Sequence, residues 1–288
     1  MKELVIVSGK GGTGKTSLTA AFAGLSDRAV LCDADVDASN LHLIMNPQVQ
    51  NQFDFLSGHS AVIDPQRCSQ CGACIDLCQW DAIDNDFAVN DLQCEGCGVC
   101  VHLCPENAID FPINKAGDWY ISDTRFGKMV HAALGIAEES SGKLVTRVRK
   151  EAKRIAEADR SDLILTDGPP GIGCPVIASI GGASALLVVT EPTMSGWHDA
   201  KRMLSLANRF GATCMLAINK FDLNLEQSAI IEKNAEERNV AVVGKLPFDP
   251  LFNKAMMQGK TIFEYNGYST TCSQVEQLWN RITDKLGL

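Results

Sequence analysis

Two cysteine-rich blocks contain the residues whose types and spacing point most directly to chemistry. Eight of the 12 cysteines lie in CSQCGACIDLC, at 68–78, and CEGCGVCVHLC, at 94–104. Both blocks have the spacing C-x2-C-x2-C-x3-C, which wraps thiolates around cubane iron–sulfur clusters and sends the fourth cysteine to the other cluster. Zinc is disfavoured, because zinc sites usually combine pairs of cysteines. The predicted [4Fe-4S] ligands are Cys68, Cys71, Cys74 and Cys104 for the first cluster, and Cys94, Cys97, Cys100 and Cys78 for the second.

A glycine-rich segment near the start of the chain has the spacing of a phosphate-binding loop. It reads GKGGTGKT, which fits G-x4-G-K-[ST], and it stands between an apolar run and a helical pattern. The glycines allow backbone N–H groups to surround phosphate oxygens at the start of the helix. Lys15 would neutralise the β- and γ-phosphates, and the Thr16 hydroxyl would hold Mg2+. The predicted nucleotide-binding residues here are Gly9, Gly11, Gly12, Thr13, Gly14, Lys15, Thr16 and Ser17.

A second lysine in this loop, Lys10, makes the segment K-G-G-x-G-K-T. The segment resembles the deviant Walker A motif of the ATPase superfamily that includes MinD, ParA and the nitrogenase iron protein. In that family the extra lysine reaches the nucleotide of the opposing subunit in a face-to-face dimer. The resemblance therefore implies an ATPase that uses ATP and Mg2+, forms a homodimer around the nucleotides, and has Lys10 and Lys15 among its catalytic residues.

Two apolar runs that we predict to be strands lead into acidic loops. Carboxylates at the carboxyl ends of such strands lie at the ligand-binding edge of an open α/β sheet. The resemblance implies that these loops are the switch regions of the family. In the first loop Asp35 would orient the attacking water and Asp33 would support Mg2+, with Asp37 as the alternative to Asp35. In the second loop Asp167 would hold Mg2+ through water, and Gly168 would sense the γ-phosphate.

A further apolar run, at residues 215–218, ends in the sequence NKFD. The N-K-x-D form is the pattern with which GTPases read guanine, whereas the matching asparagine of MinD-like proteins contacts adenine. We expect Asn219 and Asp222 to contact the base of the nucleotide. The Lys10 signature favours ATP over GTP.

The cysteine-rich segment resembles a bacterial-type ferredoxin with two clusters, including Pro105 after the last cysteine. The first block departs from that pattern, because Gln79 stands where the family usually has proline. Between Ser60 and Pro112 the chain has nine acidic residues and one basic residue, so this segment carries −8 of the total charge of −9. Such a surface predicts a redox or cluster-accepting partner with a basic docking face.

Together these segments predict an α/β fold: a parallel-sheet P-loop NTPase with an inserted α+β ferredoxin domain. The expected boundaries are residues 1–59 and 114–288 for the ATPase and residues 60–113 for the insert. Residues 145–158 are predicted to form a helix. The last helix has an apolar face that we expect to pack on the sheet and not on a membrane, because its other face lacks a basic bias. This face consists of Val275, Leu278, Trp279, Ile282 and Leu286.

Length and composition narrow the remaining possibilities. The chain has 288 residues, of which 45% are hydrophobic, with no apolar run long enough to span a bilayer and no signal-peptide pattern at its start. We therefore expect a cytoplasmic protein without a membrane partner, in a reducing compartment where cysteines serve metal or redox chemistry more often than disulfides. The negative net charge disfavours a nucleic-acid partner.

Four cysteines lie outside the two blocks. Cys32, Cys214 and Cys272 are on strand-like or helical segments, and we predict that they are core residues. Cys174 follows the acid of the second switch by seven residues, a separation at which the nitrogenase iron protein has a ligand of its shared cluster. The second cysteine which that protein needs is missing between 114 and 162. We therefore expect Cys174 to be a small buried residue or a redox contact.

Two functions are consistent with this combination of motifs. The first, which we favour, is an ATPase that couples nucleotide-driven changes of a dimer to electron transfer through two [4Fe-4S] clusters to a partner protein. The second is an ATPase that assembles or carries iron–sulfur clusters, resembling the Mrp group. Carriers of that group usually have a labile C-x-x-C near the C-terminus, whereas the last 70 or so residues here contain only Cys272.

Overall fold

The computed structural model describes residues 1–135 and 141–288, and it divides into two compact units. The first unit contains the glycine-rich loop and the acidic loops, and the second contains both cysteine blocks. Two long strands continue from one unit into the other. The first unit comprises residues 1–53, 119–133 and 141–288, and the second comprises residues 54–118 with 134 and 135.

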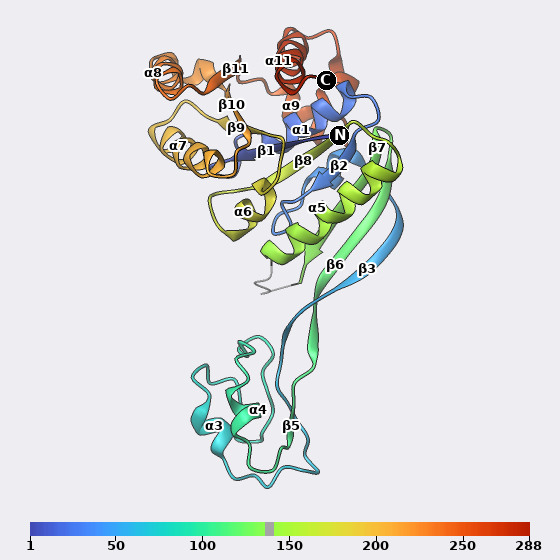
Figure 1. The fold of residues 1–288 in the computed structure, drawn as a ribbon, viewed down its shortest axis with the longest axis vertical. Helices are drawn as coiled ribbons and strands as arrows, with labels where there is room; N and C mark the ends of the chain where they lie inside the picture. The colour runs from blue at the N-terminus through green and yellow to red at the C-terminus, as the bar shows by residue number, and fades with distance from the viewer. Residues whose placement is uncertain (136–140) are drawn as a thin grey trace. The chain divides into compact units, whose positions relative to one another are not determined.

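A nine-stranded sheet organises the first unit (Figure 1). Its strands are β1 (Lys2–Ser8), β2 (Val30–Asp33), β3 (Gln48–His59), β6 (Ile113–Thr124), β7 (Gly127–Leu134), β8 (Leu163–Pro170), β9 (Ala185–Thr190), β10 (Thr213–Asn219) and β11 (Ala241–Leu246), in the spatial order β11-β10-β9-β1-β8-β2-β7-β6-β3. In this order, each strand from β11 to β7 pairs in parallel with the next one. Parallel strands need crossover connections, so their carboxyl ends meet at one edge of the sheet.

Helices cover both faces of this sheet (Figure 1). They are α1 (Lys15–Leu25), α2 (Leu41–Met45), α5 (Ser141–Ala158), α6 (Cys174–Ile180), α7 (Met194–Asn208), the 3-10 helix η1 (Phe221–Leu223), α8 (Leu225–Glu236), α9 (Leu251–Met256), α10 (Ile262–Asn266) and α11 (Thr270–Leu286). Apolar side chains of α1, α10 and α11 form one core with the sheet, and those of α6, α7 and α8 form another on β1, β9 and β10. The predicted parallel sheet with two covered faces is confirmed.

The C-terminal helix packs as the sequence predicts. All five residues of the apolar face of α11 are buried, and the ring of Trp279 stacks on Phe22 of α1 with centroids 5.0 Å apart. This burial explains why the apolar residues recur at helical spacing. In the part of the chain that the structure describes, no helix is both long and apolar enough to cross a membrane.

Three strands of the sheet, β3, β6 and β7, were not predicted from the sequence. β6 and β7 are joined by two residues, and Arg125 of this turn donates hydrogen bonds to the Glu264 carboxylate and to the carbonyl oxygens of Ile44 and Met45. β3 is an edge strand and is mostly exposed, so it lacks the alternation of apolar residues that identifies a strand.

The strand β8, which contains Asp167, also differs from its prediction. β8 continues three residues beyond Asp167, because Ser8 pairs with Pro170 and the Gly171 N–H donates to the Ser8 carbonyl. The prediction that this strand ends at the acidic residue is therefore wrong. Asp167 lies inside a strand, where backbone pairing on both sides holds it rigidly.

The second unit repeats its backbone conformation with the same sequence offset as the two cysteine blocks. Its elements are α3 (Ala73–Leu77), α4 (Val99–Leu103) and an antiparallel pair formed by β4 (Val62–Ile63) and β5 (Ile109–Asp110). The helices α3 and α4 occupy equivalent positions of the two blocks. Residues with positive φ recur in equivalent pairs, namely Gln70 with Gly96, Gly72 with Gly98, and Asp81 with Asn107. The sequence repeat is thus a structural repeat.

Candidate functional site

The glycine-rich loop joins β1 to α1 at the carboxyl edge of the sheet. Gly12 and Gly14 have φ values of +81° and +90°, which glycine adopts without steric cost. α1 has neither a side-chain cap nor an acidic residue in its first turn, so the N–H groups there are available to an anion. Within the described structure, the buried Thr13 hydroxyl has no hydrogen-bond partner. The loop therefore has unused donors, as a phosphate-binding loop requires.

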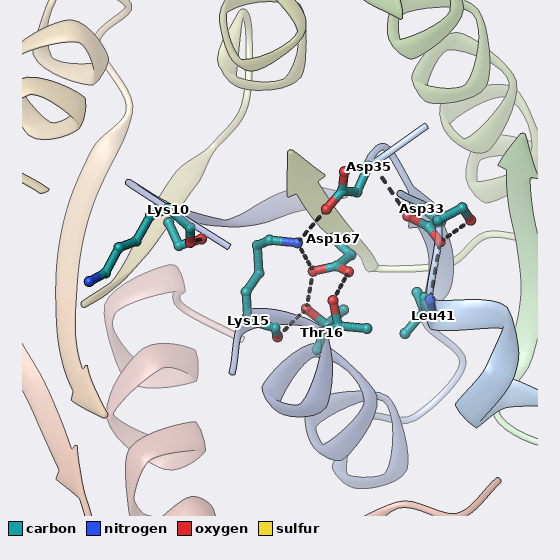
Figure 2. A network of polar contacts seen from close by, with 10 residues as sticks. Lys10, Lys15, Thr16, Asp33, Asp35, Leu41 and Asp167 are labelled. Carbon is teal, nitrogen blue, oxygen red and sulfur yellow. Dashed lines mark hydrogen bonds and ion pairs between the residues drawn. The ribbon is translucent and has the colours of Figure 1, made fainter. Parts of the chain in front are cut away.

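Lys15 and Asp167 form the centre of a buried network (Figure 2). Lys15 Nζ lies 3.1 Å from Asp35 Oδ2 and 3.3 Å from Asp167 Oδ1. The Thr16 hydroxyl donates to Asp167 Oδ2 at 2.7 Å, and the Thr19 hydroxyl donates to Asp167 Oδ1 at 3.0 Å. Thr19 was not predicted, although it lies one helical turn after Lys15 and so faces the same side of α1. The fold thus brings residues of the P-loop and of both acidic loops into contact.

Negative charge exceeds positive charge in this network. Three carboxylates, those of Asp33, Asp35 and Asp167, are buried near one ammonium group, that of Lys15. Burial raises the pKa of the Asp33 and Asp35 carboxyl groups, and the Asp167 carboxylate raises that of Asp33 further. Burial alone would lower the pKa of Lys15, but the carboxylates of Asp167 and Asp35 outweigh it and raise this pKa. A divalent cation would balance the excess negative charge.

The three acids at the end of β2 and in the turn after it, Asp33, Asp35 and Asp37, have different surroundings. Asp33 Oδ2 accepts hydrogen bonds from the Ser39 hydroxyl at 2.6 Å and from the Leu41 N–H at 3.3 Å, so Asp33 shapes its own loop. Asp35 reaches Lys15, and Asp37 is exposed. Of the two residues proposed to orient water, Asp35 is therefore the one that contacts the P-loop lysine.

Lys10 points away from this network (Figure 2). Its Nζ lies 3.8 Å from Glu191 Oε2, and 38% of its side chain is exposed. Lys220 Nζ also contacts Glu191, at 2.5 Å, and donates to the Gly12 carbonyl at 3.1 Å. Glu191, which follows β9, was not predicted as a site residue. Through its contacts with Lys10 and Lys220, Glu191 connects the P-loop to the loop that follows β10.

Two of the predicted glycines are required by close packing. A Cβ atom at Gly168 would lie 2.7 Å from Val7 Cγ1 and 2.9 Å from the Ile6 carbonyl oxygen, because β8 lies directly beside β1. A Cβ atom at Gly9 would overlap Asp199 of α7. Both positions therefore admit only glycine without a shift of the backbone.

A cavity of about 90 Å³ adjoins the P-loop. Asn219 lines it and donates from Nδ2 to the Thr13 carbonyl at 2.8 Å. Asp222 does not line this cavity, but its Oδ1 accepts a hydrogen bond from the Phe248 N–H at 2.6 Å. The structure thus places Asp222 behind the wall of the cavity. The lining residues are Gly12, Gly14, Ser17, Leu18, Asn219, Lys220, Phe248, Asp249, Phe252 and Asn253.

Sequence reasoning missed six residues of this cavity, and two of them, Leu18 and Lys220, directly follow predicted residues. Phe248 and Asp249 follow β11, and Phe252 and Asn253 belong to α9. The available signal was the turn-forming sequence PFDP directly after an apolar run, because loops at the carboxyl ends of parallel strands line ligand sites. A cavity with apolar, amide and carboxylate walls beside the P-loop has the composition of a pocket for a nucleotide base.

The eight block cysteines line two separate cavities in the second unit. One cavity is lined by Cys68, Cys71, Cys74 and Cys104, and the other is lined by Cys78, Cys94, Cys97 and Cys100. These are the two sets of four that the spacing predicts. Each cavity therefore combines three thiols from one block with one thiol from the other.

Backbone N–H groups point at several of these sulfur atoms. The Ala82 N–H lies 3.4 Å from Cys78 Sγ, and the equivalent Ala108 N–H lies 3.3 Å from Cys104 Sγ. Among the described residues no group of three or more His, Cys, Asp or Glu side chains is gathered closely enough to hold a single metal ion. The thiols surround their cavities and do not converge on one point.

The four remaining cysteines differ in exposure. Cys32 and Cys272 are buried, as predicted. Cys214 is partly buried and packs against the core of α6, α7 and α8. Cys174 is exposed at the first residue of α6, so its interpretation as a small buried residue is wrong. The chain leaves the buried strand β8 after Pro170, and Cys174 follows the exposed Gly173 at the start of α6.

The chain belongs to the CobQ/CobB/MinD/ParA nucleotide binding domain family, whose model matches residues 4–262. The uncharacterized protein MJ0578 of Methanocaldococcus jannaschii is 34% identical over 225 residues, which are 77% of this chain and 79% of that protein. An uncharacterized ATP-binding protein of the same organism, MJ0547, is 24% identical over 264 residues, which are 89% of this chain and 78% of that protein.

Solved structures share the fold. The septum site-determining protein MinD of Pyrococcus horikoshii, complexed with Mg-ADP, has a TM-score of 0.61 at 18% identity, covering 99% of this chain and 97% of that chain. The cell division ATPase MinD of Pyrococcus furiosus has a TM-score of 0.60 at 20% identity, covering 99% of each chain. The predicted α/β fold of a MinD-like P-loop NTPase is confirmed.

Proposed function

We propose that this chain binds ATP with Mg2+ at the P-loop and hydrolyses it. The proposal rests on the convergence of Lys15, Thr16 and Asp167 in a buried network beside the uncapped start of α1. Membership of a nucleotide-binding family supports it. The excess of buried carboxylates beside a loop with free N–H donors suits the combination of a divalent cation and a polyphosphate.

The residues of the network would exchange partners when nucleotide binds. Phosphates carry more charge than a carboxylate, so Lys15 would leave Asp35 and Asp167 and bind the β- and γ-phosphates. Thr16 and Asp167 would hold Mg2+, which neutralises phosphate charge when bound. Asp35, released from Lys15, would then be free to orient water. The cavity around Asn219 and Phe248 would take the base.

Phosphate release by the purified protein tests this proposal. The K15A variant should lose at least about 100-fold in kcat, because the negative charge of the transferred γ-phosphoryl group would no longer be stabilised by the ammonium group of Lys15. D35N should lose kcat but retain nucleotide binding, since its role begins after the nucleotide has bound. K150A, on the exposed side of α5, is the matched control and should keep the wild-type rate. Hydrolysis by K15A at the wild-type rate would overturn the proposal.

We propose in addition that the second unit is a ferredoxin module with two [4Fe-4S] clusters. The donor set fits, because each cavity has four thiols, apolar walls and N–H groups directed at sulfur. Zinc would hold its four thiolates about 2.3 Å from one centre. A cubane is wider and binds its thiolates at its corners, which suits thiols that surround a cavity. Bound clusters would supply one-electron redox chemistry.

The combined function that we favour is ATP-dependent electron transfer to a partner protein. ATP would hold two copies of the chain in a sandwich dimer, with Lys10 released from Glu191 to reach the nucleotide of the other copy. Hydrolysis would reverse that change. The acidic second unit would dock on a basic face of the redox partner. The exposed position of Cys174 leaves it accessible as a redox contact.

Anaerobic reconstitution followed by electron paramagnetic resonance tests the cluster assignment. Wild-type protein should bind about eight iron atoms per chain and be reduced reversibly. C97S should lose the signal of one cluster, whereas the control C214S should lose none. Wild-type protein that binds only zinc would refute the module. Transfer of intact clusters to an apo-ferredoxin faster than reduction and reoxidation would instead support an assembly or carrier ATPase.

A further inference from the structure

A wide cavity lies on the first unit, among residues that the nucleotide site does not use. Its volume is about 480 Å³. Four cations, Lys201, Arg202, Arg209 and Arg238, line it together with the apolar side chains of Ile172 and Leu206. No carboxylate is among its lining residues in the described structure. The volume is within the range of about 300 to 1,000 Å³ that is usual for binding sites.

Rigid elements hold these cations on one surface, which we call the α7 basic face. Lys201, Arg202 and Arg209 follow helical spacing along α7 and its C-terminal cap, so they share one side of the helix. The opposite side of α7 is buried in the core over β9 and β10. Arg238 follows α8, where its guanidinium donates to the Asn234 carbonyl at 3.0 Å and lies 5.7 Å from the ring centre of Trp197.

The cations of the α7 basic face lack carboxylate partners. Across the described residues, none of the four is in an ion pair, whereas Arg149 pairs with Glu3 and Arg125 pairs with Glu264. Like charges around one recess repel each other, and an anionic partner would relieve that repulsion. The polar groups of the four cations are donors only, so the partner must present acceptors.

The surroundings of the cations favour a protein surface over a small ion or a nucleic acid. All four cations are wholly or partly exposed, so a single small anion would be bound weakly in water. Arginine beside tryptophan and aliphatic side chains is the composition of protein interfaces. Outside residues 60–112, which carry −8 of the net charge of −9, the chain carries only −1, so it has no basic surplus for a polyphosphate backbone.

We infer that the α7 basic face is a docking surface for a protein partner that presents a carboxylate-rich surface. The guanidinium groups of Arg202 and Arg209 would each bind a carboxylate through two parallel N–H donors. Ile172 belongs to the loop that joins β8, which holds Asp167, to α6. A partner on this face would therefore contact the segment next to the proposed Mg2+ residue, although docking itself does not depend on ATP hydrolysis.

Fluorescence anisotropy of a labelled oligoglutamate peptide tests this inference with the full-length protein. The peptide should bind at about 50 mM salt and weaken at about 200 mM salt. R202E/R209E should lose at least about tenfold in affinity, and R202K/R209K should lose less because the charge stays. K150E/K153E makes the same charge change on the exposed side of α5 and should bind within about twofold of wild type.

Three results would overturn the inference. One is the absence of peptide binding at low salt. Another is equal weakening by R202E/R209E and by the α5 control, which would indicate a general charge effect. The last is tighter binding of a DNA oligonucleotide than of the peptide, lost in R202E/R209E, which would assign the face to nucleic acid. Thermal unfolding of each variant checks that it is folded, and phosphate release in the same samples tests the ATPase proposal separately.

Discussion

Acidification from pH 7 to pH 5 should destabilise the first unit through one buried side chain, His131. His131 lies on β7 and is 8% exposed. Its Nε2 lies 2.9 Å from the Ser122 hydroxyl, and its ring stacks on Tyr120 and on His42, with centroids 5.0 Å and 6.4 Å away. Burial, with a smaller contribution from the neighbouring His42, lowers the pKa of His131 from 6.5 to about 4.

The sign of the effect follows from these two pKa values. In the unfolded chain His131 takes up a proton as the pH falls through 6.5, whereas in the folded protein it stays neutral until the pH approaches about 4. Its contribution to stability is therefore complete above pH 6.5 and is lost as the pH falls toward 4. The full difference amounts to about 3 kcal/mol, of which about 2 kcal/mol is lost between pH 7 and pH 5.

Guanidinium unfolding of wild type and H131Q between pH 7 and pH 5 measures this contribution. Glutamine cannot be protonated but can still bond to Ser122, so H131Q should lose about 2 kcal/mol less over this range. The raised pKa values of Asp33 and Asp35 increase stability as the pH falls, which is the opposite effect. Wild type and H131Q share this contribution, so it cancels in their comparison. H198Q, at an exposed histidine, should follow wild type. Parallel pH profiles of wild type and H131Q would refute the reasoning.

Three further predictions concern packing and the P-loop. L278A should lower the free energy of unfolding by about 3 kcal/mol because Leu278 is 1% exposed, and denaturant titration against wild type would measure this loss. G14A should weaken ATP binding at least about tenfold by calorimetry, since alanine is strained at φ +90° and would displace Asn219. R125A should cost about 2 kcal/mol by removing the hydrogen bonds to Glu264 and to three carbonyl oxygens, and an unchanged unfolding midpoint would contradict that role.

Several parts of the fold were predictable from the sequence because they depend on local patterns. The segment GKGGTGKT between an apolar run and a helical pattern predicts β1, the P-loop and α1. The apolar spacing of residues 275–286 predicts the buried face of α11. The cysteine spacing predicts which four thiols share a cavity, since short loops leave few ways to group them.

Other features depend on contacts between distant segments, so no short stretch of sequence predicts them. β3 is mostly exposed and β6 is buried irregularly along its length, so neither strand alternates cleanly, and pairing in the sheet defines them. Phe248 and Phe252 become cavity residues only because the loop after β11 and the helix α9 reach the P-loop. The α7 basic face likewise requires Arg238, which the packing of α8 brings to α7.

The sequence by itself determined the chemical groups of this protein, namely a glycine-rich loop with two lysines, carboxylates at the ends of predicted strands and two sets of four thiols. Spacing within a short segment limits which groups can act together, so these were accessible without a structure. Tertiary structure decided which carboxylate meets Lys15. Asp35 contacts it and Asp37 is exposed, because the turn after β2 directs only one of them toward α1. The contact between Thr16 and Asp167 spans about 150 residues of sequence, and only the pairing of β1 with β8 brings them together.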